Sequence, residues 1–223
     1  MNTNLSLRLE TIAKMVRPCR GLADIGSDHC LLPLSLANRE DIAFLQAIDN
    51  KQGPYQNMVK AVKEAHMENR ISLSLSNGLD CLDEKVDTIV LAGMGGKLIA
   101  DILTRGKVNL AHIEYILLDA HRDLRYVREF VLGLGYTIID ENLIKEKDLF
   151  YSIILFKKGE APILNEEDLL FGPFIRRKRG KDYIDYLLQN KKRIAKILQG
   201  DISLNNRRYY DYLLNAINKE LSA

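Results

Sequence analysis

The residues best suited to chemistry begin with the string Ala23-Asp24-Ile25-Gly26-Ser27-Asp28-His29, which closes a short apolar run. A strand, a tight glycine turn and a helix in this order form the place where α/β sheets bind nucleotides. Only one glycine is present, so the GxGxxG pattern that cradles a pyrophosphate is absent. The two carboxylates would repel phosphates, and they suit a ligand that carries an amine and a sulfonium. The alternative is that Asp28 caps a helix over Leu31–Leu36.

A third carboxylate, Asp49, closes the next apolar run in the string Ala47-Ile48-Asp49-Asn50. It lies roughly 20 residues after the glycine turn, where nucleotide-binding α/β proteins hold the ribose. Two vicinal hydroxyls donate two hydrogen bonds, and one carboxylate accepts both. Asp is also a common turn residue, but in combination with the first string Asp49 favours a ribose site.

Two glycine-containing strings follow later apolar runs, Asn77-Gly78-Leu79-Asp80 and Ala92-Gly93-Met94-Gly95-Gly96. Glycines let the backbone approach a ligand without interference from a Cβ atom. Ligands of parallel sheets bind outside the carboxyl ends of the strands, so we expect these strings and the carboxylates to line one crevice. Met94 suits either a contact with a ring of the ligand or a gap in the core.

The elements that must position these residues alternate between short apolar runs and amphipathic stretches. A helix is predicted over 4–16, ending before Pro18. Buried strands are predicted for the apolar runs 21–25, 42–48, 71–75, 88–92, 115–118, 136–139 and 151–156. Further helices are predicted near 30–38, 54–68, 95–104 and 123–134. This alternation predicts an α/β fold with a mostly parallel sheet covered by helices.

The end of the chain departs from this alternation. Residues 140–149 are too few for a crossover helix, so the last two strands should pair antiparallel at one edge. Residues 157–165 are predicted to be a linker, and Asn165 offers an N-cap to a helical part. Two apolar stripes on either side of Gly200-Asp201 predict two long helices, packed as an antiparallel hairpin or short coiled coil.

Charge is divided unevenly along the chain. Residues 165–223 contain 12 Lys or Arg and 8 Asp or Glu, a balance of +4, which leaves −2 for residues 1–164 within the total of +2. A basic segment with interleaved tyrosines is typical of a surface that binds nucleic-acid phosphates. The alternative is a solvated helix face. The candidate RNA-binding residues are Arg176, Arg177, Lys178, Arg179, Lys181, Lys192 and Arg193.

Several classes of protein are not expected from this sequence. No apolar run approaches the roughly 18 residues of a membrane-spanning helix, and residues 1–4 lack the charged-then-apolar order of a signal peptide. The 3 cysteines and 4 histidines are scattered without disulfide or metal-ligand spacing. We therefore expect a cytoplasmic protein without a bound metal, and no obligate protein partner is evident.

Taken together, the strings resemble class I S-adenosylmethionine-dependent methyltransferases and, more narrowly, the bacterial tRNA (adenine-N1)-methyltransferase family TrmK. The residues that carry the resemblance are those at 24–29, 47–50, 77–80 and 92–96. The resemblance implies a seven-stranded Rossmann-like catalytic domain over 1–160 and a C-terminal coiled-coil domain over 161–223 that binds tRNA. It also implies methyl transfer from S-adenosyl-L-methionine to N1 of the adenine at position 22, in the D-arm.

The resemblance further implies a role for individual residues of the cofactor site. These residues are Asp24, Gly26, Asp28 and His29 for the methionine part, Asp49 for the ribose, Gly78 and Leu79 beside the adenine, Gly93, Met94 and Gly95 near the transferred methyl, and Asn50 as a further contact.

The sequence departs from the family after the fifth apolar run, where Asp119-Ala120-His121 replaces an expected Gln-Pro turn. The acceptor base would enter at this turn. Adenine N1 attacks through an in-plane lone pair and needs no deprotonation, so the protein has to position the base and stabilise positive charge. The candidates are Asp28, Asp119 and the carbonyls of 93–95, although Asp119 is alternatively a cap for the helix near 123–134. The chain has no Asn/Asp-Pro-Pro-Tyr/Phe string, which favours a ring nitrogen over an exocyclic amine.

Two other functions are compatible with these observations. One is a class I methyltransferase that acts on another RNA or on a small molecule. The other is a non-enzymatic RNA-binding protein with a degenerate cofactor pocket, which the intact Asp24, Gly26, Asp49 and glycine string at 93–96 argue against.

Overall fold

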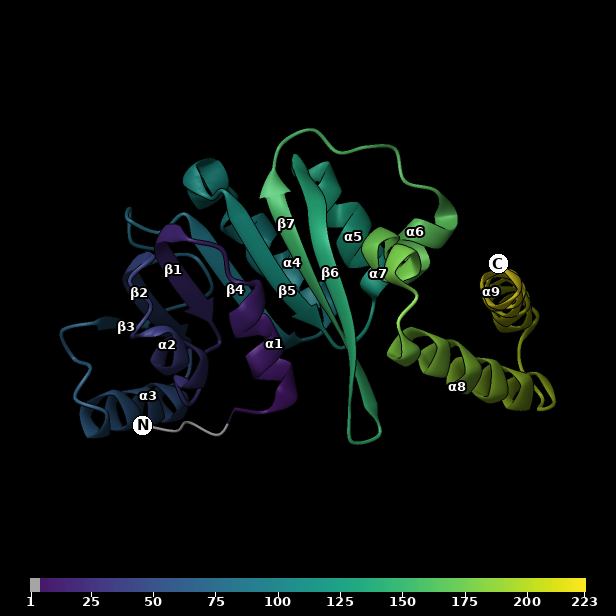
Figure 1. The fold of residues 1–223 in the computed structure, drawn as a ribbon, viewed down its shortest axis with the longest axis horizontal. Coiled ribbons are helices and arrows are strands. Elements are labelled where there is room, and N and C mark those ends of the chain that lie inside the picture. Colours follow the sequence, from purple (N-terminus) through teal and green to yellow (C-terminus); the bar gives the residue numbers. More distant parts are fainter. Residues whose placement is uncertain (1–4) are drawn as a thin grey trace.

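The computed structural model describes residues 5–223. At its centre lies a seven-stranded sheet with the order β3-β2-β1-β4-β5-β7-β6 (Figure 1). The strands are β1 (Cys19–Ile25), β2 (Ile42–Asp49), β3 (Ile71–Leu75), β4 (Thr88–Met94), β5 (Tyr115–Ala120), β6 (Tyr136–Glu146) and β7 (Leu149–Lys158). Residues 1–4 lie outside the described residues. They include the first residue of the helix expected over 4–16 and the segment in which no signal peptide is expected.

The first five strands form the parallel part of the sheet. β1 pairs in parallel with both β2 and β4, β2 pairs in parallel with β3, and β4 with β5. The prediction of a mostly parallel sheet is therefore confirmed. The carboxyl ends of these five strands lie along one edge of the sheet, which we call the carboxyl edge. The strand order reverses between β1 and β4, the place in such sheets where ligands bind.

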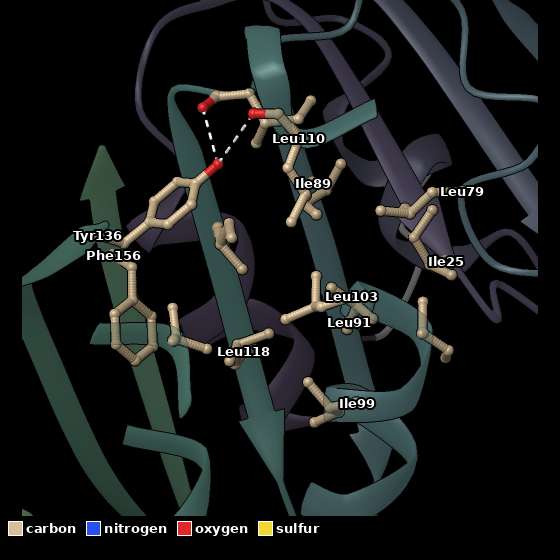
Figure 2. Packing of buried hydrophobic residues seen from close by; sticks show 14 of the residues in the cluster. Ile25, Leu79, Ile89, Leu91, Ile99, Leu103, Leu110, Leu118, Tyr136 and Phe156 are labelled. Carbon is tan, nitrogen blue, oxygen red and sulfur yellow. Dashed lines mark hydrogen bonds between the residues drawn. The ribbon is translucent and has the colours of Figure 1, made fainter. Parts of the chain in front are cut away.

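Helices cover both faces of the sheet. On one face α1 (Leu7–Met15), α2 (Leu31–Leu36) and α3 (Gln52–Glu64) bury Ile12, Leu36 and Met58. On the other face lie α4 (Gly96–Arg105), the 3-10 helix η1 (Lys107–His112) and α5 (Leu124–Gly133). Figure 1 shows α1 and α2 in front of the sheet and α4 and α5 behind it. Figure 2 shows Leu91 and Leu118, from neighbouring strands, among the α4 side chains Ile99 and Leu103.

The last two strands form the predicted antiparallel hairpin at one edge. It is longer than the sequence suggested, because residues 140–146, expected in the connection, continue β6. Each of them pairs with a residue of β7, after a bulge between Ile138 and Asp140. The turn between the two strands consists of Lys147, which has a φ of 56°, and Asp148.

Four helices follow the sheet: α6 (Glu166–Phe171), α7 (Pro173–Lys178), α8 (Lys181–Leu198) and α9 (Leu204–Ser222). Asn165 caps α6 as predicted, since its Oδ1 accepts a hydrogen bond from the amide of Asp168 at 2.8 Å. Leu187, Ile194 and Ile217 bury the contact of α8 with α9. Figure 1 shows α8 along its length and α9 nearly end-on, so this helical pair is crossed rather than aligned. Within residues 5–223, no helix has both the length and the apolar character needed to cross a membrane.

Candidate active site

Two carboxylates lie side by side in the sheet at the carboxyl edge. Asp24 is the penultimate residue of β1 and Asp49 the last residue of β2, and they are only 6% and 8% exposed. Asp24 Oδ2 accepts a hydrogen bond from Ser27 Oγ at 2.7 Å, and Asp49 Oδ1 accepts one from the amide of Lys51 at 3.0 Å. Burial raises the pKa of Asp24 to about 6; the Ser27 hydrogen bond opposes this rise and the charge of Asp49 adds to it. This pair of buried anions suits a cationic ligand.

The glycine turns after β1 and β4 touch one another. Gly26 has a φ of +76°, and a Cβ added to it would lie 2.5 Å from Met94 Cε. Gly93 has a φ of +78°, and Gly95 is the N-cap of α4. Any side chain at Gly26 would be strained and would displace Met94. The glycine strings that follow β1 and β4 therefore meet as predicted, and they expose backbone at the point where β1 and β4 diverge.

The turns after β2 and β3 are joined as well. Asn50 Nδ2 donates to Asn77 Oδ1 at 3.1 Å, and Gly78 adopts a φ of +53°. Leu79 differs from its neighbours, because its side chain is 1% exposed and packs in the core beside Ile25 (Figure 2). Its backbone, rather than its side chain, is the part that could lie beside a ligand.

Asp28 and His29 lie on the rim of this edge. Their side chains are 53% and 63% exposed, and His29 Nε2 is 3.4 Å from Asp28 Oδ2. Asn57 of α3 donates to Asp28 Oδ1 at 3.4 Å. The helix-capping interpretation of Asp28 is wrong, because the N-cap of α2 is Cys30, which makes no side-chain cap hydrogen bond.

Asp119 lies on β5 with its side chain 0% exposed. Arg8 Nη1 of α1 donates to Asp119 Oδ2 at 2.9 Å, and His121 Nε2 lies 3.8 Å from the same oxygen. Burial raises the pKa of this carboxyl, whereas Arg8 and His121 act to lower it. The helix-capping interpretation of Asp119 is also wrong, because Asp123 occupies the N-cap of α5.

Arg8, Ser27 and Tyr151 belong to this edge but were not predicted from the sequence. The Arg8 guanidinium carbon lies 5.4 Å from the centre of the Tyr151 ring, which also meets the His121 ring edge-on at 5.7 Å. Arg8 is 111 residues from Asp119 in the chain. No local motif could have found it, because Arg8 is one of several polar residues on an amphipathic helix and nothing in the sequence distinguishes it from Glu10 or Lys14.

The candidate RNA-binding residues fall into two groups. Those from Arg176 to the first residue of α8 make contacts within the chain: Arg176 with Glu220 and Asp168, Lys178 with Asp140 and the Glu141 carbonyl, Arg179 with the Glu220 carbonyl, Lys181 with Asp185, and Arg177 over the Phe174 ring at 5.2 Å. Those within α8 are exposed, and Arg193 donates to Asn190 at 3.0 Å. Lys192 and Arg193 therefore fit a phosphate-binding surface better than Arg176 and Lys178 do.

A groove of about 520 Å³ connects the carboxyl edge with the C-terminal helices. Residues 120–125, which follow β5, line it together with Phe150 of the hairpin. Arg193 of α8 and Tyr209 of α9 line the opposite side. Arg122 and Arg125 add positive charge within the range 120–125.

Comparison with known proteins agrees with this geometry. The family model described as "Methyltransferase domain" matches residues 5–154. The crystal structure of a putative tRNA (m1A22) methyltransferase from Streptococcus pneumoniae is 31% identical, has a TM-score of 0.91, and is matched over 97% of this chain and 99% of that one. The chain belongs to the TrmK family of class I methyltransferases.

Other members of the TrmK family support the same assignment. The tRNA (adenine(22)-N(1))-methyltransferase of Bacillus subtilis (strain 168) is 29% identical over 186 residues, which cover 81% of this chain and 78% of that protein. The TrmK of M. capricolum, solved with S-adenosyl-homocysteine, is 26% identical with a TM-score of 0.87, over 98% of each chain. Within residues 5–223 of this TrmK-family chain, no group of three or more His, Cys, Asp or Glu could hold a metal ion.

Proposed function

We propose that this chain transfers the methyl group of S-adenosyl-L-methionine to N1 of adenine 22 in the D-arm of tRNA. The observation that carries the proposal is the carboxyl edge, where two buried carboxylates and two touching glycine turns meet at the strand-order reversal. Named relatives with the same fold support it: the S. pneumoniae protein was solved in complex with S-adenosyl-L-methionine, and the B. subtilis relative is a tRNA (adenine(22)-N(1))-methyltransferase.

The chemistry of the carboxyl edge fits this cofactor. Asp24 offers a buried anion to the cationic methionine part, and Asp49 offers two acceptor oxygens to the ribose hydroxyls. Gly26 and Gly93 leave backbone exposed where a Cβ atom would intrude. When bound, S-adenosyl-L-methionine supplies an electrophilic methyl group, which passes to the N1 lone pair while the bonding electrons stay on sulfur.

The chain's own task in the reaction is to orient the base and to stabilise charge. The base becomes cationic as N1 gains the methyl group, and this charge is shared with the neighbouring exocyclic amine. Of the two candidate carboxylates, Asp119 is buried beside the turn that contains Gly93, whereas Asp28 is half exposed on the rim. A preorganised buried anion stabilises developing positive charge more strongly than a solvated one, so we assign this role to Asp119 and a rim contact to Asp28.

The groove beside the carboxyl edge is the proposed path of the tRNA. Adenine N1 is stacked and paired in a folded tRNA, and extruding such a base costs about a few kcal/mol. Phosphate contacts from Arg122, Arg193 and Lys192 would offset this cost. Residues 161–223 act as a tRNA-binding domain, and residues 1–160 act as the catalytic domain. A cytoplasmic location goes with this substrate and is part of the proposal.

The decisive test is methylation of unmodified tRNA, with the product nucleoside mapped by mass spectrometry. We expect 1-methyladenine at position 22, and no methyl transfer to a tRNA in which guanine replaces that adenine. Methylation at another atom, or of another RNA only, would contradict the proposal.

Asp49→Ala tests the cofactor site within the same assay. Losing a carboxylate that accepts both ribose hydroxyls should weaken S-adenosyl-L-methionine binding about 100-fold in calorimetry. Asp101→Ala is the matched control, because Asp101 is an exposed carboxylate on α4 that is paired with Arg105. Unchanged affinity in Asp49→Ala would remove the ribose assignment.

A further inference from the structure

We propose that Arg8 of α1 is a positioning residue for the acceptor base: it binds one oxygen of Asp119 and so presents the other to the exocyclic amine of the target adenine. This inference rests on the function proposed above. Arg8 itself does not touch the base; it acts through the carboxylate.

The first support is the way in which Arg8 is held. Its Nη1 atom donates to Asp119 Oδ2 at 2.9 Å and lies 3.3 Å from His121 Nε2. Its guanidinium carbon lies 5.4 Å from the Tyr151 ring centre. Contacts from β5, the residues after it and β7 therefore fix the guanidinium, and through it one edge of the carboxylate.

The second support is the other oxygen of the same carboxylate. Asp119 Oδ1 is buried and lacks a hydrogen-bond partner of normal geometry among the described residues, although the Gly93 backbone amide lies close enough to the carboxylate to act to lower its pKa. Buried polar atoms in native proteins are nearly always hydrogen-bonded, and an unsatisfied one is destabilising. An N–H donor supplied by a substrate would remove that destabilisation, and the exocyclic amine of adenine is such a donor next to N1.

The third support is the position of the cluster relative to the methyl site. A Cβ atom added to Gly93 would lie 3.1 Å from Arg8 Nη1 and 3.9 Å from His121 Nε2. The turn expected near the transferred methyl thus borders the Arg8 side chain directly.

Arg8 also controls the charge of the carboxylate. Three groups face Asp119: Arg8 from α1, His121 after β5 and the Gly93 backbone from the β4 turn. The ring of Tyr151 packs against Arg8 and His121. Burial favours the neutral carboxyl, and Arg8 is the permanent cation that opposes it. Without Arg8, Asp119 would take up a proton at a higher pH and would lose the charge that stabilises the methylated base.

The test compares Arg8→Met and Arg8→Lys with a control on the same helix, Lys14→Met, whose side chain is 76% exposed. We expect Arg8→Met to lower kcat/KM about 100-fold, with S-adenosyl-L-methionine affinity close to wild type. Its melting temperature should fall, because the buried carboxylate of Asp119 loses its cation, so activity is compared at a temperature at which both proteins are folded. The acid limb of its pH profile should move to higher pH, so that raising the pH restores part of the activity. Arg8→Lys should recover most of the loss, and Lys14→Met should match wild type.

Each outcome has a distinct meaning. If the wild type does not form 1-methyladenine in tRNA, the proposed function and this inference both fail. If the wild type is active and Arg8→Met has the same kcat/KM, only the inference fails. It fails equally if Arg8→Met loses activity without a shifted acid limb and without rescue by lysine, because Arg8 would then serve the fold alone.

Discussion

Among the individual residues, Asp24 has the most unusual environment. It is nearly buried, its hydrogen-bond donor is the neutral Ser27, and the charge that acts on its carboxylate is that of the anion Asp49. Without a ligand, its ionised form is poorly stabilised. A bound cation would reverse this and would lower the pKa of Asp24 from its value of about 6.

Cofactor binding should therefore release a proton near pH 6. The affinity for S-adenosyl-L-methionine should fall as the pH drops through about 6, because protonated Asp24 no longer attracts the cation. Calorimetry in buffers of different ionisation enthalpy measures the proton release directly. Asp24→Asn should bind weakly, with neither the release nor the pH dependence; a release of the same size in this variant would assign the proton to another group.

Asp24 gives the stability of the ligand-free protein a pH dependence opposite to that of cofactor binding. The folded-state pKa of Asp24 is raised above the ordinary value of 3.8, so the folded state takes up a proton more readily than the unfolded chain does. Its contribution to stability therefore rises as the pH falls from about 6 toward 4, by an amount on the order of 2 kcal/mol.

Most residues proposed for the cofactor site could be placed at the carboxyl edge from the sequence because their signals are local. A carboxylate or glycine directly after a buried strand carries its meaning within a few residues, as Asp24, Gly26 and Asp49 show. Arg8 and Tyr151 reach the same edge through tertiary packing of α1 and β7, and no short string records that. Leu79, itself predicted to lie beside the adenine, shows the limit of such signals, since its side chain is turned into the core and only its backbone is left for a ligand.

Among the elements, the joint between the sheet and the C-terminal helices depends on a buried ion pair. Arg128 of α5 and Glu141 of β6 are both 0% exposed, and Arg128 Nε donates to Glu141 Oε1 at 2.9 Å. Arg128 also donates to the Leu169 carbonyl of α6, and Glu141 Oε2 accepts from the amide of Phe174 in α7. One ion pair thus satisfies backbone groups of two helices outside the sheet. A Cβ added to Gly172, between those helices, would lie 2.5 Å from Glu141 Oε2.

Removing one partner of this ion pair should be costly. Arg128→Met should lower the free energy of unfolding by about 3–5 kcal/mol, because it strands a buried carboxylate. Arg128→Met combined with Glu141→Gln should lose less than the single variant. Denaturant unfolding measures both, and Arg105→Ala, which breaks an exposed pair with Asp101 within α4, is the control. A double variant less stable than Arg128→Met would contradict this account.

The elements themselves were largely predictable, and the exceptions have physical causes. Apolar runs that are buried on both faces identified the parallel strands. The outer part of β6 has polar residues such as Asn142 and Lys145, and it is a strand because β7 offers it a complete ladder. The two apolar stripes of the C-terminal helices predicted α8 and α9 but not the angle at which they cross. That angle depends on α6 and α7 as well, because α9 also packs against these short helices. Ile217 contacts the cluster of Phe171 and Ile175, and Glu220 accepts a hydrogen bond from Arg176.

For the whole molecule, net charge is a poor guide to which cationic side chains are available to bind phosphates. Residues 165–223 carry a balance of +4, yet several of their cations serve the fold. Arg176 is bound by both Glu220 and Asp168, which together with the Arg176 hydrogen bonds hold its pKa above the ordinary value. Lys192 and Arg193 are exposed instead, and Arg193 lines the groove.

This difference predicts two kinds of variant. Lys192→Ala with Arg193→Ala should weaken tRNA binding and reduce the slope of log K against log salt by about 1 for each phosphate that is no longer neutralised. Arg176→Ala should instead lower the melting temperature, because it leaves the nearly buried Glu220 without its cation. Fluorescence anisotropy over a series of salt concentrations, with a thermal melt, separates the two. A larger change of slope in Arg176→Ala would place the tRNA on α7.

The contact of Arg8 with Tyr151 can form only late in the synthesis of the chain. The first helix supplies the guanidinium, and β7, the last strand to leave the ribosome, supplies the ring beneath it. β7 then inserts between β5 and β6, so the register of the sheet stays incomplete until about residue 158 has been made. A nascent chain can form the turns after β1, β2, β3 and β4 well before this point. Cofactor binding and base positioning should consequently mature at different times during synthesis.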